Sequence, residues 1–273
     1  MAGWLPYVEL PHRADLPMQP YGALVMLGVG LGALTAVLVG RRRGLTGLDL
    51  GVLLPTAAVA AMLGGHLFDV AWYTPDAGRA RWLAYHNGHS LTGALLAVAL
   101  TAAIVTRARR LDGARVADVL AIATLVALTV GRVGCALVHD HLGVATDSVL
   151  GVDMPAYLAR GDYPRPPGAD VLRVHDLGLT ELLVLLVLVP IAFALLRRWR
   201  ARPGLLAGVV AVSYAVVRFG LDFLRLPSNE ATRGGLTGGQ WGMLAMLAVA
   251  GVALVARQRA ASAGATAPSP RGG

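Results

Sequence analysis

Charged residues are scarce in this sequence. Only 15% of its 273 residues are charged, whereas soluble domains typically carry about 25% charged residues. Hydrophobic residues make up 56% of the chain, and the mean hydropathy is +0.61. This balance argues against a water-soluble globular enzyme, a disordered chain and a collagen-like chain.

Lysine is absent, so all 24 basic residues are arginine, and glutamate occurs only at Glu9, Glu181 and Glu230. We attribute this bias, together with the abundance of alanine, glycine and leucine, to genome composition rather than to mechanism. The single cysteine, Cys135, cannot form an internal disulfide. A disulfide scaffold is therefore excluded, and cysteine usage says nothing about the redox compartment.

Long hydrophobic runs are the main feature that the sequence does have. Crossing the hydrocarbon core as a helix takes about 20 apolar residues, and seven segments approach that length. All seven are rich in leucine, valine and alanine, with interspersed glycine as in packed membrane helices. The sequence therefore predicts an all-α integral membrane protein with about seven transmembrane helices, at residues 20–40, 49–73, 91–106, 116–138, 178–196, 205–224 and 236–256.

The remaining segments are predicted to lie outside the bilayer. Residues 1–19 contain three prolines and no basic segment leading into a cleavable hydrophobic stretch, so we expect an extracytoplasmic N-terminal segment without a signal peptide. Within the membrane domain, residues 20–256, the proline-rich stretch 139–177 is expected to form a small extracytoplasmic cap. Residues 257–273, rich in alanine, serine, glycine and proline, are expected to be a disordered cytoplasmic tail. No internal repeat is seen.

The distribution of arginine predicts the orientation. The loops after the first, third, fifth and seventh spans carry arginine clusters, and seven spans place all four clusters on one side. The positive-inside rule makes that side cytoplasmic, so we expect the N-terminus outside and the C-terminus inside. The clusters are Arg41, Arg42 and Arg43; Arg107, Arg109, Arg110 and Arg115; Arg197, Arg198, Arg200 and Arg202; and Arg257 and Arg259.

The formal charge of +8 and the isoelectric point near 10.5 are values also found in nucleic-acid-binding proteins. The position of the arginines at the span ends has a simpler explanation, which is contact with anionic lipid headgroups. We therefore predict the bilayer and an anionic phospholipid as partners, and no nucleic acid.

Ionisable residues within the predicted spans mark function by default, because they are costly in a membrane. Two of them, Asp49 and Asp118, start spans and suit helix N-termini. The others lie toward the outer half, where arginine presents a fork of donors suited to a lipid phosphate. A structural ion pair between an arginine and a carboxylate is the alternative interpretation. These outer residues are His66, Asp69, Arg132, Glu181, Arg218, Asp222 and Arg225.

All seven histidines fall on the predicted outer side, and several have aspartate neighbours. A zinc site is conceivable, but no HExxH motif occurs and the ligands would come from separate segments, so we predict no metal. Cys135 precedes His139 by one helical turn. This pair suits a nucleophile and its base, although a small apolar cysteine in a helix interface is the commoner arrangement.

A series of short motifs extends along the chain, from about residue 18 to residue 256. The motifs are Pro20-Tyr21-Gly22; Gly64-Gly65-His66-Leu67-Phe68-Asp69; Asn87-Gly88-His89-Ser90-Leu91-Thr92-Gly93-Ala94-Leu95-Leu96; Ala114-Arg115-Val116-Ala117-Asp118; Gly131-Arg132-Val133-Gly134-Cys135 with Gly143; His175 to Glu181; Arg218-Phe219-x-x-Asp222-Phe223-x-Arg225; and Leu236-Thr237-x-Gly239-Gln240-Trp241. In this order they resemble the bacterial prolipoprotein diacylglyceryl transferases.

The resemblance implies a reaction. Such enzymes move the diacylglyceryl group of phosphatidylglycerol to the lipobox cysteine thiol of a prolipoprotein and release glycerol phosphate, at the outer half of the bacterial inner membrane. It implies that Arg132 and Arg225 hold the phosphate and stabilise the leaving group. Tyr21 would hydrogen bond to the headgroup, and Glu181 would orient one arginine. No cofactor is implied.

We therefore predict two sets of site residues. The expected catalytic residues are Arg132, Arg225, Tyr21 and His139. The expected substrate-binding residues are Arg132, Arg218, Arg225, Glu181, Gly143, Thr92, Cys135 and His66.

The chain departs from the family pattern near the proton transfer. Thr92 replaces the family histidine and cannot act as a base at neutral pH, while Cys135 replaces the signature asparagine and loses an amide. Similarly, His66 replaces an arginine, and Gly178-Leu179-Thr180 replaces Gln-Leu-Tyr. The base would then come from one of the nearby histidines, His66, His89, His139 or His141.

Two alternatives to the transferase follow from these departures. One is a divergent paralogue with changed lipid-directed chemistry, based on histidine and aspartate or on a metal. The other is a non-catalytic, phospholipid-binding or chaperone-like membrane protein. A transporter finds no support, because neither an inverted repeat nor paired broken helices are evident.

Overall fold

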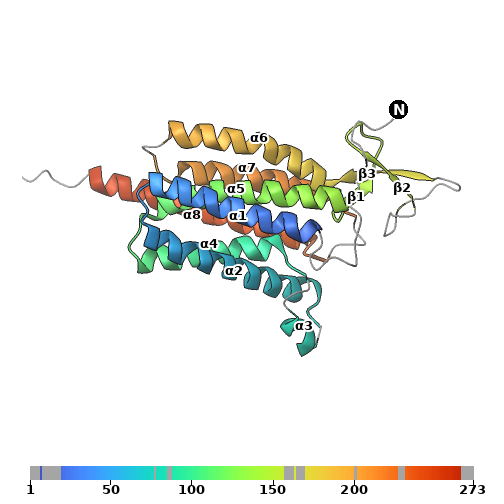
Figure 1. The fold of residues 1–273 in the computed structure, drawn as a ribbon, viewed down its shortest axis with the longest axis horizontal. Coiled ribbons are helices and arrows are strands. Elements are labelled where there is room, and N and C mark those ends of the chain that lie inside the picture. The colour runs from blue at the N-terminus through green and yellow to red at the C-terminus, as the bar shows by residue number, and fades with distance from the viewer. Residues whose placement is uncertain are drawn as a thin grey trace, which may run out of the picture.

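A computed structural model describes residues 7, 20–76, 78–84, 88–156, 163, 170–199, 202–226 and 231–265. This part of the chain forms a bundle of long helices with a small β-sheet beyond one end (Figure 1). The helices run side by side along the long axis of the molecule. The predicted all-α membrane class is thus confirmed for the bundle.

Six helices of the described chain are long and apolar enough to cross a membrane. Their most apolar windows have mean hydropathies from 1.6 to 2.7, so six of the predicted spans are found as helices. They are α1 (Pro20–Arg42), α2 (Gly47–Tyr73), α4 (Leu91–Ala108), α5 (Gly113–Val138), α6 (Leu177–Arg198) and α7 (Leu205–Leu221), which the 3₁₀ turn η1 (Asp222–Leu224) prolongs. A short helix, α3 (Arg79–Leu83), separates α2 from α4.

The seventh predicted span coincides with α8 (Gly238–Ala265), whose apolar part, Gly238–Ala253, is shorter than the six spans. The helix does not end at residue 256, as predicted, but continues to Ala265. Alanine, arginine and glutamine, which fill much of this extension, are good helix formers. The predicted tail, residues 257–273, therefore begins within α8, and residues 266–273 lie outside the described chain.

The alternating direction of the spans positions the site. The chain passes back and forth along the bundle, so the starts of α1, α4, α6 and α8 lie at the same end as the last turns of α2, α5 and α7 (Figure 1). This end carries the sheet and is called the sheet end below. Residues far apart in sequence, such as Tyr21 and Arg218, are therefore brought to one level of the bundle.

The two aspartates expected at helix N-termini have different roles. Asp49 forms a capping box with Thr46 at the start of α2, with two 3.1 Å hydrogen bonds between backbone N–H groups and side chains. Asp118 lies inside α5, and its carboxylate accepts hydrogen bonds from the backbone N–H groups of Gly204 and Ala207, each 2.9 Å long. Asp118 therefore caps α7, a neighbouring helix, rather than its own.

Small residues let the spans approach closely. A Cβ added to Gly28 of α1 would lie 2.6 Å from the carbonyl oxygen of Ala127 in α5, and one on Gly32 would lie 2.8 Å from that of Ala123. Because apolar surface is not driven out of a lipid solvent, such close van der Waals packing is what holds membrane helices together. It makes α1 and α5 a tightly packed pair.

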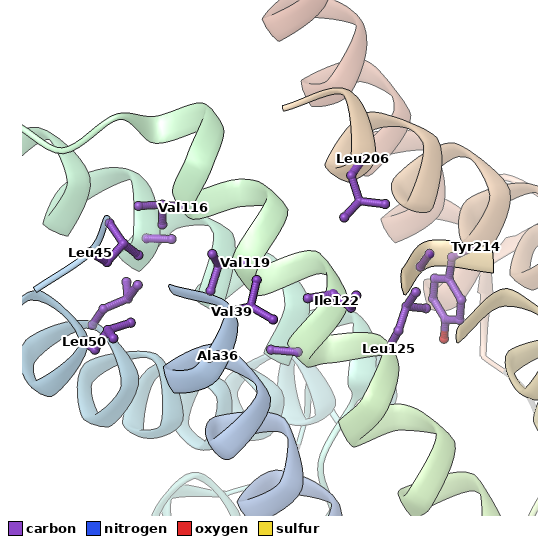
Figure 2. Close-up of a cluster of buried hydrophobic side chains, with 14 of the residues drawn as sticks. Ala36, Val39, Leu45, Leu50, Val116, Val119, Ile122, Leu125, Leu206 and Tyr214 are labelled. Atoms are coloured by element: carbon purple, nitrogen blue, oxygen red, sulfur yellow. The ribbon is translucent and has the colours of Figure 1, made fainter. Parts of the chain in front are cut away.

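The main apolar core lies between α1, α2 and α5 and reaches α7. Figure 2 shows Leu50 beside Leu45 at one end of this cluster and Val39 beside Val119 of α5, with Leu206 and Tyr214 of α7 toward its other end. Many large apolar side chains instead point outward, including Leu100 (64% exposed) and Val216 (61% exposed). An apolar exterior of this kind suits contact with lipid tails.

The predicted cap segment, residues 139–177, contains strands that the sequence did not indicate. β1 (Leu142–Ala145), β2 (Val152–Pro155) and β3 (Val171–Asp176) form an antiparallel sheet in the order β1-β3-β2. Met154, Leu172 and Val174 form a small core on this sheet, together with Leu226 from the segment after α7. The sheet is thereby attached to the end of the α7 span.

Candidate active site

The sheet end contains a cavity of about 250 Å³. It is formed by the last turns of α2, α5 and α7, the first turns of α4 and α8, and the turn between α5 and β1. Its lining combines three guanidinium groups with carboxyl, imidazole and hydroxyl groups. The lining residues are Asp69, Tyr73, His89, Ser90, Leu91, Thr92, Arg132, His141, Arg218, Asp222, Arg225, Gly239 and Met243.

A chain of alternating charges, Arg132–Glu181–Arg218–Asp222–Arg225, lies along one side of this cavity. Nε of Arg132 lies 2.9 Å from Oε1 of Glu181, and Nε of Arg218 lies 3.8 Å from Oε2 of the same carboxylate. Asp222 Oδ1 then pairs with Nη1 of Arg218 and, at 2.8 Å, with Nε of Arg225. The structural ion pairs considered from sequence are therefore present, and the same three arginines line the cavity.

The chain of charges has an excess of one positive charge, since three guanidinium groups share two carboxylates. Buried ion pairs need further hydrogen bonds to offset the cost of leaving water. For Arg225, which lies just beyond the α7 span, burial and the neighbouring Arg218 cation lower the pKa of the guanidinium. An anion in the cavity would relieve this repulsion, so the electrostatics favour an anionic ligand.

Asp222 is also held by the start of α8. The Thr237 hydroxyl donates a 2.6 Å hydrogen bond to Oδ2 of Asp222 and accepts one of 3.1 Å from the backbone N–H of Gln240. In return, Oε1 of Gln240 accepts from the backbone N–H of Thr237 at 3.0 Å, which completes a capping box. Gly239 allows the close approach, since a Cβ there would overlap the Asp222 carboxylate.

Glu181 is fixed from a third helix. The hydroxyl of Tyr214 in α7 donates a 2.7 Å hydrogen bond to its Oε1. The side chain of Glu181 is only 4% exposed, so water does not solvate its charge. Two arginines and this phenol stabilise the carboxylate instead. Glu181 is not among the described residues that line the cavity and instead orients those that do.

Arg132 is hydrogen bonded to Cys135, which in turn lies near Tyr21. Its Nη1 donates a hydrogen bond to Sγ of Cys135 at 3.3 Å, and this sulfur lies 4.0 Å from the hydroxyl of Tyr21 in α1. Cys135 is buried. The structure thus places Cys135 against Arg132 and Tyr21 against Cys135, and neither of the two is among the residues that line the cavity.

Gly143 positions Arg225. The two residues form an isolated β-bridge, and a Cβ on Gly143 would overlap the carbonyl oxygen of Leu224. The carbonyl oxygen of Gly143 also accepts a 3.0 Å hydrogen bond from the Tyr163 hydroxyl. A glycine is therefore needed where β1 passes the end of η1, although Gly143 does not itself line the cavity.

Two of the four histidines considered as bases from sequence, His89 and His141, reach the cavity, whereas His66 and His139, which we placed among the site residues, do not line it. His141 lines it and binds Oδ1 of Asp140 through Nδ1, while His89 lines it near the start of α4. His139 instead bonds through Nδ1 to Asp176 at 2.6 Å and stacks on Tyr7, with ring centroids 4.6 Å apart.

His66 also lies outside the lining. Its ring nitrogens lie 3.1 Å from the carbonyl oxygen of Trp82 and 3.4 Å from that of Gly88. The side chain is buried and holds the segment around α3 against α2. These contacts describe a structural role, and the structure does not bring His66 to the arginines.

Cys135, Asp140 and His141 are the described residues whose arrangement most resembles a metal site, with one ligand atom from each within 4.8 Å of the others. Two of these atoms are already engaged, because Sγ of Cys135 accepts from Arg132 and Nδ1 of His141 bonds to Asp140. The nearby guanidinium groups also repel a cation. The surroundings therefore suit an anion better than a metal ion.

Of the predicted residues, Arg132, Arg218, Arg225 and Thr92 line the cavity, whereas Tyr21, Cys135, Glu181 and Gly143 support the lining from behind. Sequence reasoning missed Tyr73 and Met243. Tyr73 could have been found from its spacing, since it follows Asp69 by four residues at the end of the same predicted span and so shares its helix face.

Comparison with known proteins shows which family the chain is similar to. The family model described as prolipoprotein diacylglyceryl transferase matches residues 10–256. A relative from Beijerinckia indica subsp. indica, named phosphatidylglycerol–prolipoprotein diacylglyceryl transferase, is 31% identical over 261 residues, which are 90% of this chain and 91% of the relative. Proteins of the same name from Cupriavidus necator and Roseobacter denitrificans are 29% and 28% identical, covering 94% and 91% of this chain and 95% and 92% of their own lengths.

The family model matches nearly the whole chain, and the relatives are similar over nearly their full lengths. The similarity therefore extends over the whole fold and is not limited to one motif. With three arginines converging on a cavity at one end of a bundle of membrane spans, the chain belongs to the prolipoprotein diacylglyceryl transferase family.

Proposed function

We propose that the protein transfers the diacylglyceryl group of phosphatidylglycerol to the thiol of a lipobox cysteine in a prolipoprotein. The observation that carries this proposal is the convergence of Arg132, Arg218 and Arg225 on one cavity at the sheet end. The relatives are named for this reaction. No cofactor is required by the chemistry.

The arginines supply the electrostatic part of the reaction. A guanidinium group binds phosphate oxygens through a fork of donors. The phosphodiester of phosphatidylglycerol carries one negative charge, which matches the excess charge of the arginine and carboxylate chain. When the glycerol phosphate leaves, it gains a second negative charge, and preorganised cations that are already in place stabilise that change.

The supporting residues act by position. Glu181 and Asp222 each hold two arginines at fixed separation. Cys135 and Tyr21 buttress Arg132, and Thr92 forms part of the wall at the start of α4. We assign no headgroup contact to Tyr21 and no base function to Thr92.

We further propose a topology of seven spans, with α8 as the seventh, in a bacterial inner membrane. The N-terminus and the sheet would lie outside, and the C-terminus inside, because the arginine clusters follow the ends of α1, α4 and α6. Reporter fusions after residue 150 and after residue 265 test this topology. Outer-side signal from the first and cytoplasmic signal from the second are expected, and the reverse pattern would refute the orientation.

The activity test uses purified protein in phosphatidylglycerol vesicles with a lipobox peptide, followed by mass spectrometry of the peptide. The wild-type protein should add one diacylglyceryl group, and Arg132→Ala should lower the rate by about 100-fold or more. Arg173→Ala is the matched control, since Arg173 pairs with Asp153 in the sheet at 2.5 Å and should retain the rate.

Other results separate the alternatives. Loss of the lipid headgroup without peptide modification would indicate a hydrolase. Stabilisation of the protein by phosphatidylglycerol, through ligand linkage, without any turnover would indicate a lipid-binding protein. Either result beside an active family member would overturn the transferase proposal.

A further inference from the structure

The reaction needs a group that takes the proton of the acceptor thiol. A cysteine thiol has a pKa of about 8.5, so most of it is protonated at neutral pH. Thr92, which replaces the family histidine, lines the cavity but carries only a hydroxyl group. The candidates among the described cavity residues are therefore the imidazoles of His89 and His141.

We propose that His141, oriented by Asp140, is the general base that deprotonates the acceptor thiol. This inference rests on the proposed transferase function. Nδ1 of His141 is hydrogen bonded to Oδ1 of Asp140. A carboxylate at that nitrogen holds the proton there and leaves Nε2 as the basic atom. The ring is 26% exposed and lines the cavity, so a thiol can reach it.

His141 lies beside the group that would hold the phosphate. One of its ring nitrogens lies within 4.8 Å of Sγ of Cys135. This sulfur accepts the hydrogen bond from Nη1 of Arg132. His141 and Arg132 both line the cavity, so the acceptor thiol and the lipid phosphate can be held side by side there. When the base, the thiol and the phosphodiester are held together, proton removal and attack by the sulfur need no further diffusion of the reactants.

The groups around the ring keep it in its basic form. Burial, together with the guanidinium groups of Arg132 and Arg225, lowers the pKa of His141 below its ordinary value of 6.5, and the Asp140 carboxylate opposes them. The thiol of Cys135 is the remaining titratable neighbour within this group. A lowered pKa leaves the imidazole neutral at pH 7, as a base must be.

His89 is the weaker candidate. Among the described residues no carboxylate is hydrogen bonded to it, and the nearby Asp69 is engaged by Arg81 at 2.6 Å. Its ring lies 5.9 Å from that of His66, and burial and that neighbour lower its pKa. Without an orienting partner, nothing selects which ring nitrogen faces the cavity.

The proposed step balances as follows. Nε2 of His141 takes the thiol proton, and the sulfur attacks the glycerol carbon that bears the phosphodiester. A carbon–sulfur bond forms, and the bond between that carbon and the phosphate oxygen breaks. The electron pair goes to the oxygen of the departing glycerol phosphate, whose added charge faces Arg132, Arg218 and Arg225. The imidazolium then releases its proton to water.

The test compares His141→Gln with the matched control His175→Gln, which alters a half-buried histidine of β3 outside the described cavity lining. Rates with the lipobox peptide are measured from pH 5.5 to pH 9.5, and phosphatidylglycerol binding is measured separately. His141→Gln should lower kcat about 100-fold or more at pH 7 with unchanged lipid binding. The deficit should shrink at least tenfold at pH 9.5, where the thiol ionises by itself. Arg132→Ala should show no such alkaline recovery.

Asp140→Asn provides a second test if His141→Gln does not fold. Removing the orienting carboxylate should lower kcat rather than raise KM, recover at high pH, and be rescued by Asp140→Glu. Wild-type rates in both the His141 and Asp140 variants, or loss of activity in His89→Gln alone, would overturn this inference and leave the transferase proposal standing. Absence of product from the wild-type enzyme, beside an active family member, would overturn both.

Discussion

The hydroxyl of Thr237 donates a 2.6 Å hydrogen bond to the Oδ2 atom of Asp222. The same hydroxyl caps the start of α8. One side chain therefore couples the beginning of the last helix to the carboxylate that holds Arg218 and Arg225. The stability of α8 and the geometry of the anion site are linked through it.

This link can be tested by Thr237→Val, which keeps the side-chain shape and removes the hydroxyl. The loss of a helix cap and of a hydrogen bond to a buried carboxylate should cost about 2 kcal/mol or more. Unfolding in detergent micelles measures this change, and the transfer rate should fall with it. Thr237→Ser retains both bonds and should resemble the wild type; equal loss in both variants would contradict the role assigned to the hydroxyl.

Gly143 is expected to be intolerant of any side chain. In Gly143→Ala the new methyl group would overlap the carbonyl oxygen of Leu224 and push Arg225 away from the cavity. Overpacking of this kind costs about 1–3 kcal/mol, and we expect transfer activity to fall in parallel. Gly30→Ala is the control, because no atom lies within 4 Å of a Cβ there; a harmless Gly143→Ala would show that the contact is not limiting.

Tyr214→Phe separates stability from turnover. The change removes the 2.7 Å hydrogen bond to Oε1 of Glu181, a bond to a buried charged group, which should destabilise the fold by about 1.5–3 kcal/mol. Turnover at a temperature where the variant is folded should change little, since Arg132 and Arg218 still hold Glu181. A large loss of kcat in fully folded Tyr214→Phe would instead place the phenol in the reaction.

The fold is expected to lose stability on mild acidification. Burial lowers the pKa values of His89, His141 and His175 below the ordinary value of 6.5. The unfolded chain therefore binds protons near pH 6.5 that the folded chain does not yet bind, and the free energy of unfolding falls as the pH drops through that region. Unfolding titrations at pH 8, 6.5 and 5.5 measure this trend. His175→Gln should show a shallower dependence than the wild type, and an identical slope would refute the contribution of His175.

The spans could be predicted because their length and composition are local properties of the sequence. The partners of polar residues could not. Asp118 lies close to the predicted start of its own helix, which made it look like that helix's cap. In the structure it caps α7 instead, because the packing of α5 against α7 brings the Gly204 backbone N–H to the Asp118 carboxylate. The arginines of the site were identifiable, since ionisable groups inside spans are rare and costly.

The choice between neighbouring histidines depended on one backbone conformation. His139 ends α5 in the left-handed region, with φ of 49°, where residues other than glycine are uncommon. This turn sends His139 toward Asp176 and His141 toward the cavity. Helical spacing from Cys135 favoured His139 as the site residue, whereas the structure brings His141, another of the candidate bases, to the cavity lining.

The two ends of α7 are fixed in different ways. At one end Asp118 of α5 binds its first turn, and at the other Arg218 joins the chain of charges that includes Arg132 of α5. Because contacts at both ends oppose sliding of α7 along α5, we expect these two helices to move together as one rigid unit. We therefore expect a two-tailed lipid to reach the cavity between other helices, so that tethering α5 covalently to α7 should leave the passage of lipid open.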